Sequence, residues 1–397
     1  MQRNRSSSSR KLRPNKFPSP PSILSLAAIV SSVDENIDRI RTRSLDLSFN
    51  ELLDMHSTGE LIIQPEYQRL FRWSEGKQSR FIESLILEMP IPPIFVIEME
   101  DGRLELIDGL QRISSYLHFR GQNPTRVHPD GTPSKLRLLE CDVATALNGL
   151  DYDSLPSALQ IRLKRNFVRV EIIRKESDLR LRYYMFKRLN TGGENLSDQE
   201  VRNCTIRLLS NTFNQFIMDQ SQAEDFAACL SIISEEQKAQ RYDQELVLRF
   251  FAFKNYRQHY IHEVGDFMTE YMERVSDPAG AETFEYDRER QTFLSTFKIL
   301  GKTLGENAFA RTNTHGNFIS SFLSYHYEAF TLGLQPYLEV LSPDDETQMA
   351  TVARVLVSIK NDEKFRAMTT GGGKNYPRNL SERIALVQTA LRDAFTD

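Results

Sequence analysis

The sequence predicts an α+β fold, in which a mixed N-terminal domain over residues 45–205 is followed by an all-helical domain over residues 206–397. Short apolar runs bounded by turn residues occur up to Ile173, as is typical of strands. From about Val201 onwards the apolar residues recur at helical spacing. A chain of 397 residues is long enough for two such domains, each with its own core.

The composition is that of an ordinary globular protein. The formal net charge is −4, from 50 basic and 54 acidic side chains, which excludes a general nucleic-acid coat but permits one local basic groove. The three cysteines, Cys141, Cys204 and Cys229, lie too far apart for a C-x-x-C motif and indicate a reducing compartment. No run approaches the roughly 18–20 apolar residues of a membrane helix, so we expect a cytoplasmic protein without a membrane partner.

Residues 1–22 are basic and rich in serine and proline, and we expect them to form a disordered, solvated tail. The apolar stretch Ile23–Val30 that follows leaves an export or transit signal open as the alternative. Pro14, Pro18 and Pro20 interrupt any presequence helix, and no clear A-x-A cleavage site is present. The sequence therefore favours a tail over a targeting signal.

The N-terminal domain alternates helical and strand-like segments. Helices are expected at Ser48–His56, Gln78–Glu88, 111–120 and Leu179–Leu189. Strands are expected at Ile94–Ile97, Leu104–Ile107, Leu136–Val143 and Phe167–Ile173, with a hairpin turn at Asp101-Gly102.

Further helices make up the C-terminal half. Ser197-Asp198-Gln199-Glu200 has the pattern of a capping box, in which the serine and glutamate side chains each bond the other's backbone N–H, and it predicts a helix start. The clearest helices after it are expected at Gln244–Tyr256, Glu289–Leu304, Asn317–Thr331 and Glu346–Ile359.

The strongest candidate site is a strand, then Asp108-Gly109-Leu110-Gln111-Arg112, then a helix. A glycine at such a turn lets the backbone approach a ligand, and the first N–H groups of the helix attract an anion. Arg112 can grip two phosphate oxygens, while Asp108 can hold Mg²⁺ or orient a water molecule. A plain capped helix with a surface arginine is the alternative for this segment alone.

Two other segments offer groups that suit a nucleotide. Gln68, Arg69 and Arg72 lie close to Trp73, the only tryptophan; arginine binds phosphate and an aromatic ring stacks on a base. A core tryptophan with solvated arginines is the alternative. Asn190-Thr191-Gly192-Gly193 is a glycine-rich turn with amide and hydroxyl groups, although such a turn often only ends a helix.

Together these segments resemble the family that includes the N-terminal domain of GmrSD restriction enzymes. The resemblance runs through roughly residues 45–205 and is carried by Pro65, Tyr67-Gln68-Arg69, Trp73, Ile91-Pro92-Pro93-Ile94, Asp108–Ser115 and Phe186–Asn203. It implies a ParB/sulfiredoxin-like fold that binds, and in some relatives hydrolyses, nucleotides in defence against foreign or modified DNA. By this resemblance Asp108, Gln111 and Arg112 are the catalytic candidates.

The expected ligands are an NTP and Mg²⁺, and the expected partners are DNA or a DNA-cutting protein. The family signature is usually D-G-Q-Q-R, and Leu110 stands here in place of its first glutamine, which favours nucleotide binding over hydrolysis. Residues 205–397 contain no D-H-x-x-P stretch or similar histidine cluster, which argues against a nuclease in this chain. A non-catalytic DNA-binding or scaffold protein and a ParB-like nuclease remain the alternatives.

Overall fold

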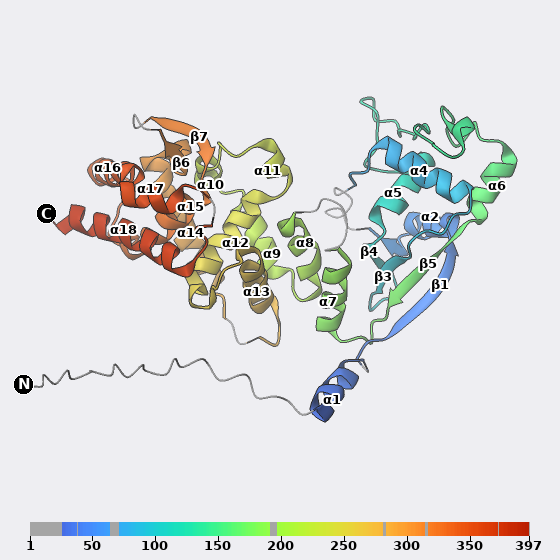
Figure 1. Cartoon of the computed structure of the whole chain (residues 1–397), viewed down its shortest axis with the longest axis horizontal. Coiled ribbons are helices and arrows are strands. Elements are labelled where there is room, and N and C mark those ends of the chain that lie inside the picture. Colours follow the sequence, from blue (N-terminus) through green and yellow to red (C-terminus); the bar gives the residue numbers. More distant parts are fainter. Residues whose placement is uncertain are drawn as a thin grey trace, which may run out of the picture.

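The structure is a computed structural model, and it describes residues 26–37, 39–63, 71–190, 197–280, 283–313, 317–371 and 373–396. Figure 1 shows a lobe with a β-sheet, which holds the N-terminal half, beside a helical lobe, which holds the C-terminal half. Among the described residues, no helix combines the length and apolarity needed to cross a bilayer.

The N-terminal lobe is built on a five-stranded mixed sheet in the order β1-β5-β3-β4-β2. Its strands are β1 (Thr42–Ser48), β2 (Leu61–Ile62), β3 (Ile94–Glu98), β4 (Leu104–Asp108) and β5 (Phe167–Ile173). β1 pairs antiparallel with β5, in a register that joins Thr42 to Ile173 and Ser48 to Phe167. β3 pairs parallel with β5 and antiparallel with β4.

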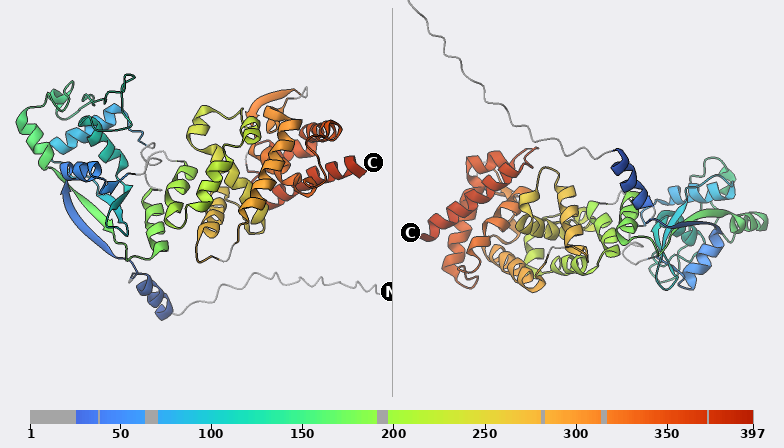
Figure 2. Two further views of the ribbon diagram at one scale, coloured as in Figure 1. Left: turned by 180° about the vertical axis from the view of Figure 1, so that it is seen from behind. Right: turned by 90° about the horizontal axis from the view of Figure 1, so that it is seen from below.

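Four helices complete this lobe: α2 (Phe49–Ser57), α4 (Glu75–Ile86), α5 (Leu110–Phe119) and α6 (Ser157–Arg165). Serine hydroxyls cap two of them, since Ser48 accepts from the Glu51 backbone N–H and Ser74 from that of Lys77. The apolar sides of α2, α4 and α5 share one core with the sheet. Helix α1 (Leu26–Ile37) projects from the end of the lobe near the start of β1 (Figure 2).

The C-terminal lobe is a helical assembly around a second, aromatic-rich core. Its α-helices are α9 (Thr212–Gln220), α10 (Glu224–Cys229), α11 (Glu235–Ala239), α12 (Tyr242–Asn255), α13 (Val264–Ser276), α14 (Tyr286–Thr303), α15 (Ser324–Gly333), α16 (Glu346–Asn361), α17 (Glu363–Thr369) and α18 (Pro377–Thr396). The short 3₁₀ turns are η1 (Thr145–Leu147) in the N-terminal lobe and, after α8, η2 (Ile206–Leu208), η3 (Arg257–His259), η4 (Gly305–Asn307) and η5 (Gln335–Tyr337).

Helices α7 (Leu179–Asn190) and α8 (Asp198–Thr205) lie between the two lobes (Figure 1). Helix α7 contributes to both cores, because Tyr183 is buried in the C-terminal core while Met185 and Leu189 pack against the N-terminal one. The two cores therefore meet along α7 without merging into one.

Two sequence predictions are wrong. The C-terminal half is not all helical: the predicted helix Asn317–Thr331 begins as strand β7 (Phe318–Phe322), which pairs with β6 (Ala310–Thr312), and only then continues as α15. The spacing of Phe318 and Phe322 suits a helix as well as a strand, and so short a run cannot distinguish them.

The predicted strand Leu136–Val143 is also absent. Leu136, Leu138 and Cys141 are buried, but the segment joins no β-ladder. Its backbone N–H groups bond elsewhere, for example from Leu138 to the Leu150 carbonyl at 2.8 Å. The buried residues therefore belong to an irregular segment that packs on the core, and an apolar run in the sequence does not distinguish such a segment from a strand.

Candidate functional site

The candidate site begins at the turn between β4 and α5. Gly109 occupies the N-cap position with φ +111°, a left-handed conformation that favours glycine. A Cβ atom at this position would lie 2.9 Å from Cγ1 of Ile94, so the turn also packs closely against β3. No side chain hydrogen-bonds the N–H groups in the first turn of α5 as a cap.

Arg112 lies beneath this turn and is 8% exposed. Its Nη1 donates to the carbonyl oxygens of Pro92 and Pro93 at 2.6 and 3.0 Å, and its Nη2 donates to Oδ2 of Asp108 at 2.6 Å. The predicted phosphate contact of Arg112 stays a prediction. The geometry adds a positioning role, because the guanidinium fixes the Asp108 carboxylate and the Pro92-Pro93 backbone together.

The Asp108 carboxylate is the acidic group that this arrangement presents outward. Its side chain is 37% exposed, and the hydrogen bond and ion pair seen among the described residues both engage Oδ2. Mg²⁺ bound with a nucleotide usually takes one or two carboxylates and completes its shell with phosphate oxygens and water. The described residues hold no group of three or more His, Cys, Asp or Glu side chains that would form a metal cage. Among the described residues, Asp108 could therefore contribute only one of the several ligands that a metal ion requires.

Gln111 connects the turn to the second predicted segment. Its Oε1 accepts from the backbone N–H groups of Arg72 and Trp73 at 3.0 and 3.1 Å. The Trp73 ring packs edge-on against Phe81 of α4, with ring centroids 5.8 Å apart. The tryptophan is thus partly a core residue, as the structural alternative for this segment held, and the amide of Gln111 supports the backbone around it.

Arg72 carries the connection on to the third segment. Its Nη2 forms an ion pair with Oε1 of Glu200, a carboxylate that is nearly fully buried in α8. The other oxygen of Glu200 accepts from the Ser197 backbone N–H at 2.9 Å, and the Ser197 hydroxyl accepts from the Glu200 N–H. The predicted capping box is confirmed, and its glutamate also binds the segment that precedes α4.

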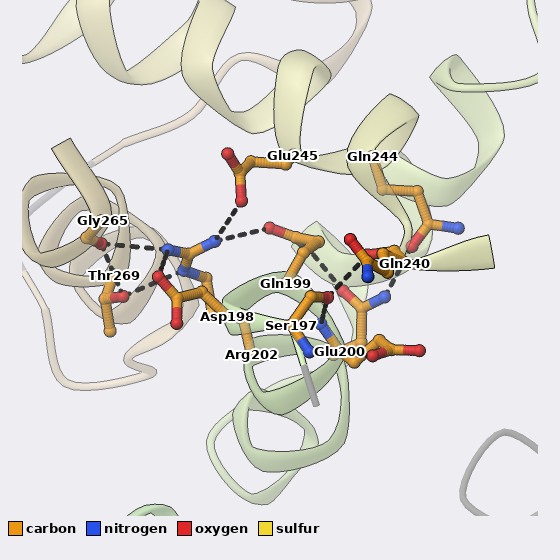
Figure 3. Close-up of polar contacts among 11 residues, drawn as sticks. Ser197, Asp198, Gln199, Glu200, Arg202, Gln240, Gln244, Glu245, Gly265 and Thr269 are labelled. Atoms are coloured by element: carbon orange, nitrogen blue, oxygen red, sulfur yellow. Dashed lines mark hydrogen bonds and ion pairs between the residues drawn. The ribbon is translucent and has the colours of Figure 1, made fainter. Parts of the chain in front are cut away.

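Other side chains of α8 bind the helical lobe, as Figure 3 shows. The buried Arg202 guanidinium donates to Thr269 Oγ1 (2.9 Å) and the Gly265 carbonyl (3.1 Å) of α13, and to Gln199 Oε1 (3.0 Å) in α8. It also reaches Glu245 of α12. Burial lowers the pKa of Arg202, while the carboxylates of Glu245 and Asp198 oppose that effect.

The described residues thus bring together Arg72, Gly109, Asp108, Gln111 and Arg112. Of the other predicted site residues, Gln68, Arg69, Thr191, Gly192 and Gly193 lie outside the described residues, as does the side chain of Asn190. The backbone of Asn190 ends α7, close to the predicted end of that helix. Sequence reasoning treated Glu200 only as a cap and gave Arg202 no role. The sequence feature that could have pointed to Glu200 and Arg202 was their position within the Ser197–Asn203 part of the family motif.

Comparison with protein families gives a match over residues 49–207 to the model described as GmrSD restriction endonuclease, N-terminal domain. The chain carries this domain. The predicted resemblance over residues 45–205 is confirmed. No curated protein and no solved structure matches the chain.

The GmrSD N-terminal domain as matched includes the whole set of contacts from Arg72 to Arg202. It ends at Arg207, whose Nη2 lies 3.4 Å from Oε1 of Glu105 on β4. Helix α8 therefore belongs to the GmrSD N-terminal domain by sequence, although several of its polar side chains bind the helical lobe.

Proposed function

We propose that this chain is the nucleotide-binding part of a restriction-like defence system directed against DNA. The family match supports the restriction-type context, and a ParB/sulfiredoxin-like fold for the N-terminal domain is part of the proposal. The observation that carries the nucleotide site is the convergence of the motif segments at one helix start. There, Asp108 faces outward, Gly109 opens the backbone, and Gln111 and Arg72 connect to Glu200.

In this proposal the phosphates of an NTP lie at the uncapped first turn of α5, with Mg²⁺ held by Asp108. Arg112 keeps the carboxylate oriented from below, and it completes the phosphate site if its contacts to the Pro92 and Pro93 carbonyls exchange on binding. Gln68, Arg69 and the residues Asn190–Gly193 remain the proposed further contacts. Mg²⁺ would neutralise phosphate charge, while the residues of the chain position the nucleotide.

Binding without rapid hydrolysis is the form we favour. Leu110, which replaces the usual glutamine, is 4% exposed and packs in the N-terminal core. That position therefore offers the bound nucleotide no polar group. The second candidate function is a DNA-binding or scaffold protein, and the same observation favours it over an NTPase.

The test is isothermal titration of the full chain with each of the four NTPs, with and without Mg²⁺. We expect saturable binding of at least one NTP that Asp108→Asn weakens about tenfold or more, the scale for losing one charge-assisted contact. Asp101→Asn is the matched control, because Asp101 is an exposed aspartate at the β3–β4 turn. Thermal melts would show that both variants are folded.

Absence of saturable binding by the wild-type chain at millimolar NTP would reject the nucleotide site. Saturable NTP binding separates the nucleotide-binding candidate from the DNA-binding or scaffold one, and phosphate release measured with and without DNA shows whether the bound nucleotide is hydrolysed. Fast NTP hydrolysis would contradict the inference that Leu110, in place of the usual glutamine, disfavours hydrolysis.

A further inference from the structure

A hollow lies on the N-terminal lobe, between α6 and the outer side of the β1–β5 ladder. It has a volume of about 740 Å³. It is lined by Asp46, Glu88, Met89, Pro90, Ile91 and residues of α6 and β5 between Ala158 and Arg169. This volume lies within the range of about 300–1,000 Å³ that is typical of ligand-binding pockets.

Three arginines and two carboxylates line the hollow, an excess of one positive charge in a chain whose net charge is −4. Arg162, Arg165 and Arg169 line it, and two of them are paired: Arg162 with Glu88 at 3.5 Å and Arg169 with Asp46 at 3.1 Å. Arg165 has no ion-pair partner among the described residues. Lys164, the preceding residue on α6, is exposed but does not line the hollow, so Arg165 is the described cation there that is left to meet an anion.

An exposed aromatic ring lies beside these cations. Phe167 is the first residue of β5, and its side chain is on the open side of the strand, where the residue is 65% exposed. Ile161 and Met89 add exposed apolar surface at 49% and 41%. An aromatic ring left in water is unfavourable, and the burial of Val168 and Val170 shows that the fold itself uses the other side of β5.

We propose that this hollow binds an unpaired segment of DNA, with a backbone phosphate on Arg165 and one base stacked on Phe167. Cations next to an exposed aromatic ring are the combination by which proteins hold single-stranded nucleic acid. The choice of DNA rests on the proposed function, whereas the phosphate and base contacts rest on the residues of the hollow.

The hollow is separate from the Asp108 site, but consecutive residues of the chain contribute to the two. Pro90 and Ile91 line the hollow, and the next two residues, Pro92 and Pro93, give their carbonyl oxygens to Arg112. Variants for the hollow are therefore placed on α6 and β5, away from this shared segment.

The experiment is fluorescence anisotropy of the full chain with a labelled single-stranded oligodeoxythymidylate of about 20 nucleotides, a length above the usual site size of roughly 4–16. We expect Phe167→Ala to weaken binding roughly five- to a hundredfold, the range for one stacked base. Arg165→Glu should weaken binding about tenfold or more and lower the salt slope by about one. Both positions are exposed and outside the cores, so both variants should melt like the wild type.

Matched controls come from the helical lobe. Arg354→Glu makes the same charge change on the exposed side of α16, and Phe395→Ala removes an exposed ring from α18. Both should leave the oligonucleotide affinity within about twofold of the wild type. Equal losses in the controls, unchanged affinity in both hollow variants, or no binding by the wild-type chain would overturn the proposal.

Failure of the proposed function would look different. Loss of NTP binding in the titrations described above would leave the effects of Phe167→Ala and Arg165→Glu on the oligonucleotide intact. Conversely, if the chain binds NTP but Phe167→Ala and Arg165→Glu leave its oligonucleotide affinity unchanged, only the proposal for the hollow is refuted.

Discussion

Replacement of Gly109 with alanine tests the turn on which the candidate site is built. The residue would keep φ +111°, and a left-handed conformation costs a side-chain-bearing residue roughly 1–2 kcal/mol. The new Cβ would also lie 2.9 Å from Cγ1 of Ile94, and overpacking of this kind typically costs about 1–3 kcal/mol. We therefore expect Gly109→Ala to lower the free energy of unfolding by about 2–5 kcal/mol.

Gly59 provides the matched control, because its φ is +79° but a Cβ there would meet no atom within 4 Å. Gly59→Ala should cost only the conformational part, about 1–2 kcal/mol. Urea denaturation of both variants gives the difference directly. If the two losses are equal within error, the close approach to Ile94 is not what requires glycine at the turn.

A double-mutant cycle makes the assignment sharper. Ile94→Ala removes both side-chain atoms that lie nearest the new Cβ, and by itself it should cost about 2–5 kcal/mol as a buried large-to-small change. The double variant should lose less than the sum of the two single variants by about 1–3 kcal/mol, the overpacking part. Strict additivity would refute the reasoning.

Two further predictions concern buried charge in the helical lobe and its junction. Arg202→Met should lower the free energy of unfolding by about 3–5 kcal/mol, because it leaves the partly buried Glu245 without this partner. Arg354→Met, at an exposed site, should change the free energy of unfolding by less than about 0.5 kcal/mol. Equal shifts of the melting temperature in the two variants would contradict this prediction. Burial lowers the pKa of Lys360 to about 7 from its usual 10.5. Between pH 7 and pH 10.5 the unfolded state therefore binds more protons than the folded state. This group then makes the free energy of unfolding rise with pH, by at most about 1.4 kcal/mol per pH unit. Lys360→Met should remove that slope between pH 7.5 and 9.5 in urea titrations, and an unchanged slope would show that Lys360 is not its source.

Local patterns predicted the local structure well. The alternation of Phe167–Ile173 gave β5 with its observed bounds, and Ser197 and Glu200 formed the capping box that their spacing indicated. Gly109 lies at the strand-to-helix turn that the pattern predicted, and the structure gives it a positive φ. These features depend on residues within a few positions of one another, which is why a single sequence reveals them.

The long-range contacts of the site could not be predicted in the same way. Nothing in the sequence around Arg112 indicates that its guanidinium binds the carbonyls of Pro92 and Pro93, because backbone acceptors leave no mark on residue identity. The pair between Arg72 and Glu200 spans 128 positions and depends on how α8 lies against the N-terminal lobe. Glu200 lies within the family motif and Arg72 was a candidate phosphate ligand beside Trp73, but neither pattern indicated that the two side chains touch.

The pairing of β1 with β5 sets a time at which the N-terminal lobe can be completed. The two strands form a seven-residue ladder, yet the segment between them contains the rest of the sheet. At a synthesis rate of about 5–20 residues per second, β1 leaves the ribosome roughly 6–25 seconds before β5 is available. During that interval β1 has no ladder partner, and unpaired strand edges are prone to wrong pairing. Closure of this sheet is therefore a late, non-local step of the kind that slows folding, and slower translation would lengthen the period in which a chaperone has an edge to protect.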